Sequence, residues 1–97
     1  MNNWRTKKLR NLTIAILAIK DRSVLENFLR DLCTAEELDE ISSRWDVVLL
    51  LAKGESYREI AKKTKVSTTT VTRIAQWLNG GEGGYKAVLS ALLSENK

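Results

Sequence analysis

The chain has 97 residues, of which 43% are hydrophobic and 29% charged, and its net charge is +4. These values are typical of one small globular domain that cannot bury a large core alone, so partner subunits could complete the core. One cysteine and no histidine are present, which excludes disulfide frameworks, the usual Cys/His zinc sites and histidine general-base catalysis, and we expect no enzyme. Without an eighteen-residue apolar run or a signal-peptide pattern, we expect a cytoplasmic protein that does not enter membranes.

Apolar residues recur at helical spacing from the N-terminus to about residue 54. They predict a first helix around Leu9–Ile19 and a second around Val24–Leu32, joined by a short polar turn. A third helix is predicted to begin at a capping box of Thr34 and Glu37 and to stop at Gly54. Its apolar positions cover most of its circumference, so we expect a central helix packed on several sides. Its main apolar stripe comprises Leu38, Ile41, Trp45, Val48, Leu49 and Ala52.

Residues 56–78 contain two further short helical patterns with only Lys65 and Val66 between them. Ser56 is the expected N-cap of the first helix, Tyr57 to about Thr64, and Ser67 caps the second, Thr68 to about Leu78. This spacing is typical of a helix-turn-helix. The turn usually has glycine where this chain has Lys65, and a lysine at positive φ costs about 1 kcal/mol. The expected inward positions are Ile60, Ala61, Thr64, Val66, Val71, Ile74, Trp77 and Leu78.

Beyond the helix-turn-helix, the sequence "GGEGG" at residues 80–84 is expected to stop a helix and to form a flexible link. It does not fit a phosphate loop, because no strand precedes it and no Lys-Ser/Thr follows it. Tyr85 is expected to anchor the last helix. We expect Trp4, Trp45 and Trp77 in the core, although Trp4 could instead pack on a partner subunit. The chain has no proline and no alternating strand pattern, so the predicted fold class is all-α.

Charge is distributed unevenly along these elements. Residues 1–20 carry five bases and no acid, and residues 21–52 carry three bases against eight acids. Residues 53–79 have a surplus of four positive charges. Clustered bases on a compact helical unit are expected of a protein that binds a phosphate backbone. On charge alone, a solvated face without a partner is an equal alternative.

The second helix of the helix-turn-helix carries threonine at four of five positions, 68–72. Threonine is a mediocre helix former, and the four together cost about 2 kcal/mol relative to alanine. Hydroxyls near a helix N-terminus reach phosphate oxygens and base edges in the major groove, which would offset this cost. The alternative is that only the first hydroxyls matter, as caps. The predicted DNA-binding residues are Ser67, Thr68, Thr69, Thr70, Thr72, Arg73 and Gln76, together with the bases Lys53, Arg58, Lys62, Lys63 and Lys65.

Five segments resemble a known family: "AILAIKD", "DLCTAEEL", "SRWDVVLLLAKGESYREIA", "STTTVTRI" and "LNGGEGGY". They are similar to the Trp-repressor-related family of the YerC/YecD type, a branch of the Trp repressor superfamily, from residue 12 to about 92. The resemblance implies an all-helical, intertwined homodimer that reads double-stranded DNA in the major groove as a repressor. One domain, residues 1–97, would comprise dimerisation helices (1–53), the helix-turn-helix (56–78) and a C-terminal helix (84–95).

The resemblance also bears on a small-molecule effector. Thr34, Arg44 and Arg73 match the threonine and two arginines with which Trp repressor holds its tryptophan. That repressor has a glycine after the second arginine, whereas here Ile74 should fill the space of the indole, so we do not expect L-tryptophan as a co-repressor. The favoured alternative is that Thr34 is an N-cap and Arg44 a salt-bridge partner of the acidic segment. A different effector, or none, is left open.

Two other functions compete with a DNA-binding regulator. One is a helical dimer that uses the same helices as a scaffold for protein interactions, without specific DNA binding. The other is an accessory subunit of an enzyme. Salt dependence distinguishes the DNA-binding regulator from the scaffold. A DNA-binding protein binds duplex DNA with an affinity that falls steeply as salt rises, whereas a scaffold for protein interactions should show no such binding.

Overall fold

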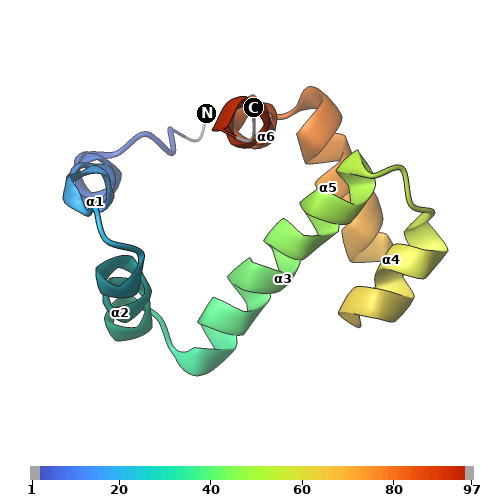
Figure 1. The fold of residues 1–97 in the computed structure, drawn as a ribbon, viewed down its shortest axis with the longest axis horizontal. Coiled ribbons are helices and arrows are strands. Elements are labelled where there is room, and N and C mark those ends of the chain that lie inside the picture. The colour runs from blue at the N-terminus through green and yellow to red at the C-terminus, as the bar shows by residue number, and fades with distance from the viewer. Residues whose placement is uncertain (1–2, 96–97) are drawn as a thin grey trace. The chain divides into compact units, whose positions relative to one another are not determined.

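The computed structural model describes residues 3–95 and contains six helices and no strand in that range. This confirms the predicted all-α class. None of these helices has both the length and the apolar character needed to span a bilayer. The helices are α1 (Lys7–Ala18), α2 (Arg22–Leu32), α3 (Ala35–Ala52), α4 (Tyr57–Thr64), α5 (Thr68–Gly80) and α6 (Gly84–Glu95) (Figure 1).

The starts of α3, α4 and α5 are fixed by the predicted capping residues. In the capping box, the Thr34 N–H donates to Glu37 Oε1 at 2.9 Å, and the Glu37 N–H donates to Thr34 Oγ1 at 3.1 Å. Two hydrogen bonds with Thr34 lower the pKa of Glu37 below its usual value of 4.5. The bond to the Thr34 backbone has the larger effect and the bond to its side chain the smaller one. Ser56 and Ser67 accept the N–H groups three residues further on, at 3.2 and 3.1 Å.

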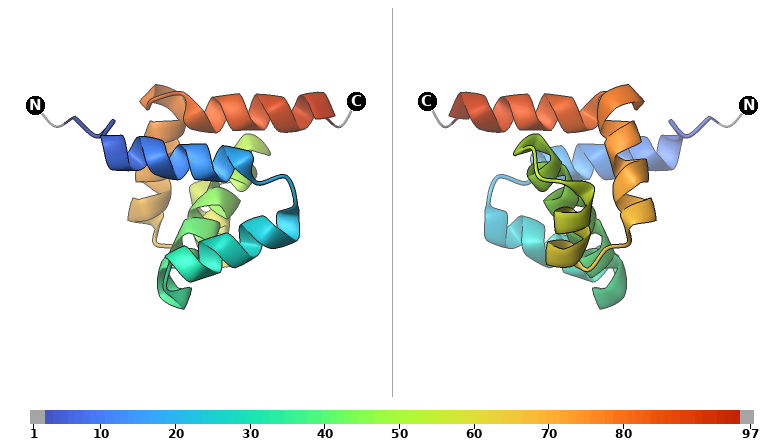
Figure 2. Two further views of the ribbon diagram at one scale, coloured as in Figure 1. Left: turned by 90° about the vertical axis from the view of Figure 1, so that its left-hand side faces the viewer. Right: turned by 90° about the vertical axis from the view of Figure 1, so that its right-hand side faces the viewer.

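The chain divides into two compact units, residues 1–38 and residues 39–97. In the first unit, α2 turns back along α1 (Figure 2, left), and neither helix contains a buried side chain. Ile14, Leu17, Val24 and Leu32 are all more than half exposed, and Leu17 reaches 83%. Apolar side chains of both helices are therefore left uncovered by the described residues, although the predicted positions Leu9 and Ile19 are half-buried.

The core lies in the second unit, where α3, α4 and α5 meet. Val47 and Val48 from α3, Ile60 from α4, and Val71 and Ile74 from α5 are fully buried. Figure 2 shows α6 along its length as it leaves the end of α5, on which it packs. The inward positions predicted for α4 and α5 are confirmed, with Trp77 as the exception. Partly buried side chains that pack on this core are Trp45, Leu50, Leu51, Ala61, Val66, Leu78, Tyr85 and Leu89.

Trp4 and Trp77 are not core residues of the described chain, so the prediction was wrong for Trp77, and for Trp4 the alternative of packing on a partner subunit stays a prediction. They are 47% and 48% exposed, respectively. Trp77 lies at the edge of the inward face of α5, beside residues 81–84, three of which are glycine. Trp45 does pack on the core, and its ring centroid lies 6.2 Å from that of Tyr85. Tyr85 therefore anchors α6 as predicted.

The prediction that α3 is packed on several sides holds only for its C-terminal half. Ile41, on the predicted apolar stripe, is 55% exposed, and Ala52 at the helix end is exposed as well. Within the second unit, the core reaches only the part of α3 around Val47 and Val48.

Glycines end α3 and α5 for two different reasons. Gly54 follows α3 with a φ of +84°, a conformation that glycine adopts at no steric cost, which confirms the predicted stop. At the end of α5, a Cβ added to Gly81 would lie 2.4 Å from the Trp77 carbonyl oxygen. A side chain at position 81 therefore clashes with the last turn of α5, and the predicted helix stop in residues 80–84 is confirmed.

Candidate nucleic-acid interface

The turn between α4 and α5 has the backbone geometry that the helix-turn-helix pattern predicts. Lys65 has φ 62° and ψ 18°, and it is the only non-glycine residue with positive φ in the described part of the chain. Its N–H donates to the Ala61 carbonyl at 2.8 Å. Thr64 closes the turn, since its hydroxyl donates to the Ile60 carbonyl at 2.7 Å and accepts the Val66 N–H at 3.3 Å. The turn is therefore held by hydrogen bonds on both sides of the left-handed residue.

Two hydroxyls of the threonine-rich segment have no partner within residues 3–95. Ser67 Oγ accepts the Thr70 N–H and donates to Thr70 Oγ1 at 3.0 Å, so both hydroxyls belong to the helix cap. Thr72 Oγ1 donates to the Thr68 carbonyl at 2.9 Å. Thr68 and Thr69, in the first turn of α5, are exposed and their hydroxyls have no hydrogen bond to residues 3–95, whereas the half-buried Thr70 accepts from Ser67.

The rest of this face is also solvent-accessible. Thr72, Arg73 and Gln76 are exposed, and the side chains of Arg73 and Gln76 have no hydrogen bond to the described residues. Thr70 differs from the others because it is half-buried. The N–H groups of a first helical turn lack intrahelical acceptors and carry partial positive charge. The first turn of α5 thus combines free backbone donors with the free hydroxyls of Thr68 and Thr69.

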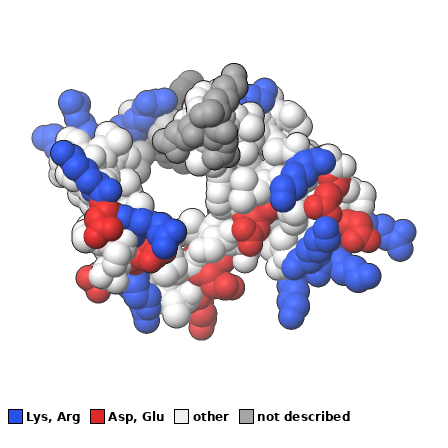
Figure 3. All heavy atoms as spheres, in the orientation of Figure 1, with Lys and Arg blue, Asp and Glu red and all other residues white. Residues whose placement is uncertain are grey.

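The predicted basic residues form an exposed cluster around this surface. Figure 3 shows lysine and arginine side chains gathered over α4, with a few acidic side chains among them. Lys53, Arg58, Lys62 and Lys65 are exposed and make no ion pair with residues 3–95. These four cations are available to phosphate oxygens.

Lys63 differs from the other predicted bases because it forms an ion pair with Glu55, which precedes the N-cap of α4. The hydrogen bond to the Glu55 carboxylate raises the pKa of Lys63. Lys63 also lines, together with Lys53, a hollow of about 340 Å³ at the junction of α3 and α4. Its charge is partly neutralised by Glu55, so Lys63 is less available to a phosphate than Lys62 beside it.

The three residues proposed for effector binding occupy different environments. Thr34 caps α3, and Arg44 forms an ion pair with Glu40 at 3.0 Å, one helical turn away. These are the contacts that the alternative interpretation assigns to them. Arg73 is exposed, and the next residue, Ile74, is fully buried in the core. An effector role for Thr34, Arg44 and Arg73 stays a prediction.

The chain is similar to known proteins over most of its length. A family model described as Trp repressor protein matches residues 7–93. "Uncharacterized protein YerC" of Bacillus subtilis (strain 168) is 35% identical over 89 residues, covering 92% of this chain and 86% of that protein. The crystal structure of a TrpR like protein from Eubacterium eligens ATCC 27750 is 36% identical, with a TM-score of 0.85 over 91% of each chain. A candidate Trp repressor from Staphylococcus aureus is 31% identical, with a TM-score of 0.84 over 91% of this chain and 88% of that one.

Proposed function

Because the chain belongs to the Trp repressor family of non-enzymatic DNA-binding proteins, we propose that it is a transcriptional repressor that binds specific sequences of double-stranded DNA. The observation that carries this proposal is the first turn of α5. There the Thr68 and Thr69 hydroxyls have no partner within the described residues, and unpaired cations lie on α4 and in the turn. Such a surface offers donors for base edges and charge for phosphates.

In the proposed complex, α5 is the recognition helix and lies in the major groove. The second helix of a helix-turn-helix enters this groove with its N-terminal residues at the base edges, as in Trp repressor itself. Thr68 and Thr69 would contact base edges through their hydroxyls, and the Thr72 methyl would face a thymine methyl. Arg73 and Gln76 carry the side chains that pair with guanine and adenine, respectively. Thr70 would act indirectly, by holding the Ser67 cap.

The basic residues would position the protein without reading sequence. Lys53, Arg58, Lys62 and Lys65 release counterions when they contact phosphates, so each adds to the salt dependence of binding. Lys63 would first have to leave Glu55, and its net contribution is smaller. Removal of one positioning lysine should weaken all DNA sequences alike.

We further propose that the protein acts as a homodimer of one domain, residues 1–97, with residues 1–53 supplying the dimerisation helices. The support is that α1 and α2 have no buried side chain, although both carry an apolar face. A second copy would cover these faces. Two copies of the helix-turn-helix, residues 56–78, would then read two half-sites related by the same symmetry as the protein. Residues 84–95 would complete the domain as the C-terminal helix.

The test is a selection of bound sequences from random duplex DNA, followed by affinity measurements at several salt concentrations. We expect an enriched motif with two half-sites, and an affinity for it that falls linearly with salt on logarithmic axes. Absence of any enriched motif, with equal weak binding to all duplexes, would contradict the proposal. It would favour the alternative of a helical scaffold that binds other proteins.

A further inference from the structure

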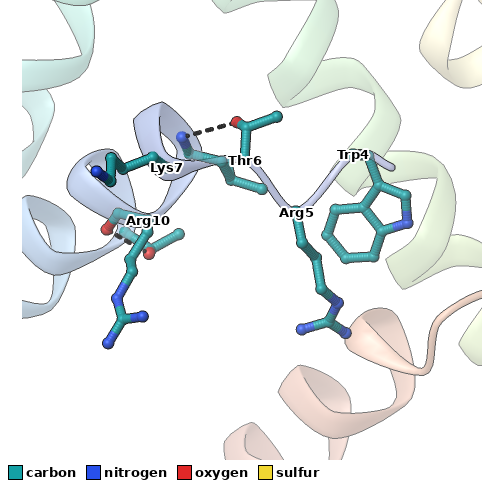
Figure 4. Close-up of a pocket in the computed structure, with 7 residues that line it drawn as sticks. Trp4, Arg5, Thr6, Lys7 and Arg10 are labelled. Carbon is teal, nitrogen blue, oxygen red and sulfur yellow. Dashed lines mark hydrogen bonds between the residues drawn. The ribbon is translucent and has the colours of Figure 1, made fainter. Parts of the chain in front are cut away.

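A second basic surface lies in the first unit, apart in sequence from the helix-turn-helix. Residues 1–20 carry five bases and no acid. At the start of α1 a pocket of about 520 Å³ is lined by Trp4, Arg5, Lys7 and Arg10 and by the adjoining Thr6 and Thr13 (Figure 4). We refer to this group of residues as the N-terminal basic pocket.

The cations of this pocket are not neutralised within the described chain. Arg5, Lys7 and Arg10 are exposed and make no ion pair with residues 3–95. Figure 4 shows the side chains of Arg5 and Arg10 extending from the backbone in similar directions, with open space between their guanidinium groups. Two guanidinium groups and a lysine that line one hollow without an ion pair are available to an anionic partner.

Trp4 gives part of this pocket a defined shape. The Arg5 guanidinium lies over the Trp4 ring, 4.5 Å from its centroid. A cation over the face of an indole is attracted by the ring quadrupole, so Arg5 is restrained while its N–H groups stay available. Guanidinium groups present planar pairs of donors that match the oxygens of a phosphate. The ligand chemistry that this pocket fits is therefore a phosphate group.

We propose that the N-terminal basic pocket is a second DNA-binding surface, which holds backbone phosphates in addition to those contacted by the helix-turn-helix. This inference rests on the proposed function. Duplex DNA fits better than an anionic membrane, because the three cations surround one hollow within two helical turns instead of lining the polar face of a long amphipathic helix. A backbone contact of this kind adds affinity and salt dependence but no sequence preference.

The experiment uses the full chain and two duplexes that contain the same selected site. The short duplex ends at the site, and the long one extends it by about one helical turn, roughly 10 base pairs, on each side. The triple variant Arg5→Gln, Lys7→Gln, Arg10→Gln is compared with the wild type and with Lys8→Gln. Lys8 is the matched control, since it is an exposed base of α1 that does not line the pocket.

For the wild type we expect a steeper salt dependence on the long duplex than on the short one. The triple variant should lose this difference, at about 0.9 units of log–log slope for each phosphate contact removed. Lys8→Gln should keep it, and none of these variants should change the selected sequence. The inference is overturned if the triple variant keeps the wild-type slope on the long duplex, or if Lys8→Gln loses as much slope as the triple variant.

Two further outcomes distinguish a failure of this inference from a failure of the proposed function and from a membrane-binding role of the pocket. If no duplex is bound specifically by any of the proteins, the proposed function itself fails. If the triple substitution abolishes binding to phosphatidylserine vesicles but leaves DNA binding unchanged, the pocket serves a membrane surface and the DNA inference is wrong.

A pair of substitutions at Trp4 tests whether its ring positions the Arg5 guanidinium. Trp4→Ala should reduce the extra slope on the long duplex, because Arg5 loses the ring beneath it. Trp4→Tyr should restore most of that slope, since a phenol ring also attracts a guanidinium group. A tyrosine variant no better than the alanine variant would show that Trp4 does not position Arg5.

Discussion

At the turn between α4 and α5, Lys65 holds a left-handed conformation with a φ of 62°. A side chain with a Cβ crowds the backbone in this region, whereas glycine does not. The fold tolerates the cost because the turn is closed by the hydrogen bonds of Ala61 and Thr64. A lysine here also adds a cation next to the proposed recognition helix.

Lys65→Gly should therefore raise the free energy of unfolding by about 1 kcal/mol, because it removes the left-handed penalty. Lys62→Gly is the matched control, since it removes the same side chain from the interior of α4 and should lower stability by about 1 kcal/mol. Urea unfolding of both variants measures the two changes. A destabilised Lys65→Gly variant would contradict the strain assigned to this turn.

Ile74 leads to a prediction about the effector. Its side chain is fully buried among Val47, Val48, Ile60 and Val71, so it occupies the core where the family resemblance places a glycine beside the indole. We expect free L-tryptophan to show no saturable binding in calorimetry, and DNA affinity to be insensitive to it. Saturable binding in the micromolar range would mean that the ligand uses space that Ile74 does not fill.

Single residues show which features of the site follow from the sequence. Ser56, Ser67 and Thr34 were predictable as caps, because a cap depends only on residues within one helical turn. The Lys63–Glu55 ion pair was not, since the two residues are eight positions apart and meet only when α4 follows the turn after α3. The hydroxyl bonds of Thr70 and Thr72 also escaped prediction, because side-chain rotamers decide between helix carbonyls and solvent.

At the scale of helices, α5 combines two roles on opposite faces. Val71, Ile74 and Ala75 bury one face in the core, while the exposed face carries Thr68 and Thr69. The hydrophobic period alone predicts this division, because residues three and four positions apart share a face. The exposure of Trp77 did not follow from the period, since Trp77 lies at the edge of the inward face, beside the glycine-rich residues 81–84.

A substitution at Gly81 tests the close approach between residue 81 and the Trp77 carbonyl oxygen at the end of α5. Gly81→Ala should destabilise the protein by about 1 to 3 kcal/mol, because its Cβ would lie 2.4 Å from a backbone oxygen that cannot yield easily. Gly80→Ala is the control, because a Cβ there meets nothing within 4 Å and alanine favours the helix. Thermal unfolding compares the two, and equal melting temperatures would contradict the proposed clash.

For the whole molecule, the exposed apolar residues of the first unit support the proposed homodimer. Helices without a buried side chain contribute little to the stability of a monomer, and a small domain needs most of its apolar surface covered. We expect sedimentation at micromolar concentration to give a dimer, with a melting temperature that rises with protein concentration. A stable folded monomer would contradict this expectation.

A pair of variants on α1 locates the interface. Leu17→Glu places a charge at a side chain that is 83% exposed in the single chain, so it would be harmless in a monomer. In a dimer that covers this face, it should cause dissociation or unfolding. Asn11→Glu, which adds the same charge at an exposed polar position of α1, should leave the dimer intact. Identical sedimentation of the two variants would exclude Leu17 from the interface.

The central claim is that the first turn of α5 reads DNA sequence while the neighbouring lysines only position the protein. The most direct measurement is the ratio of affinities for the selected duplex and a scrambled one, at a single salt concentration. The double variant Thr68→Val, Thr69→Val keeps the side-chain shapes but removes the free hydroxyls. Loss of two hydrogen bonds should reduce the ratio at least about fivefold, roughly 1 kcal/mol. Lys62→Gln should weaken both duplexes equally and preserve the ratio. An unchanged ratio in the threonine variant, or a collapsed ratio in Lys62→Gln, would contradict the account.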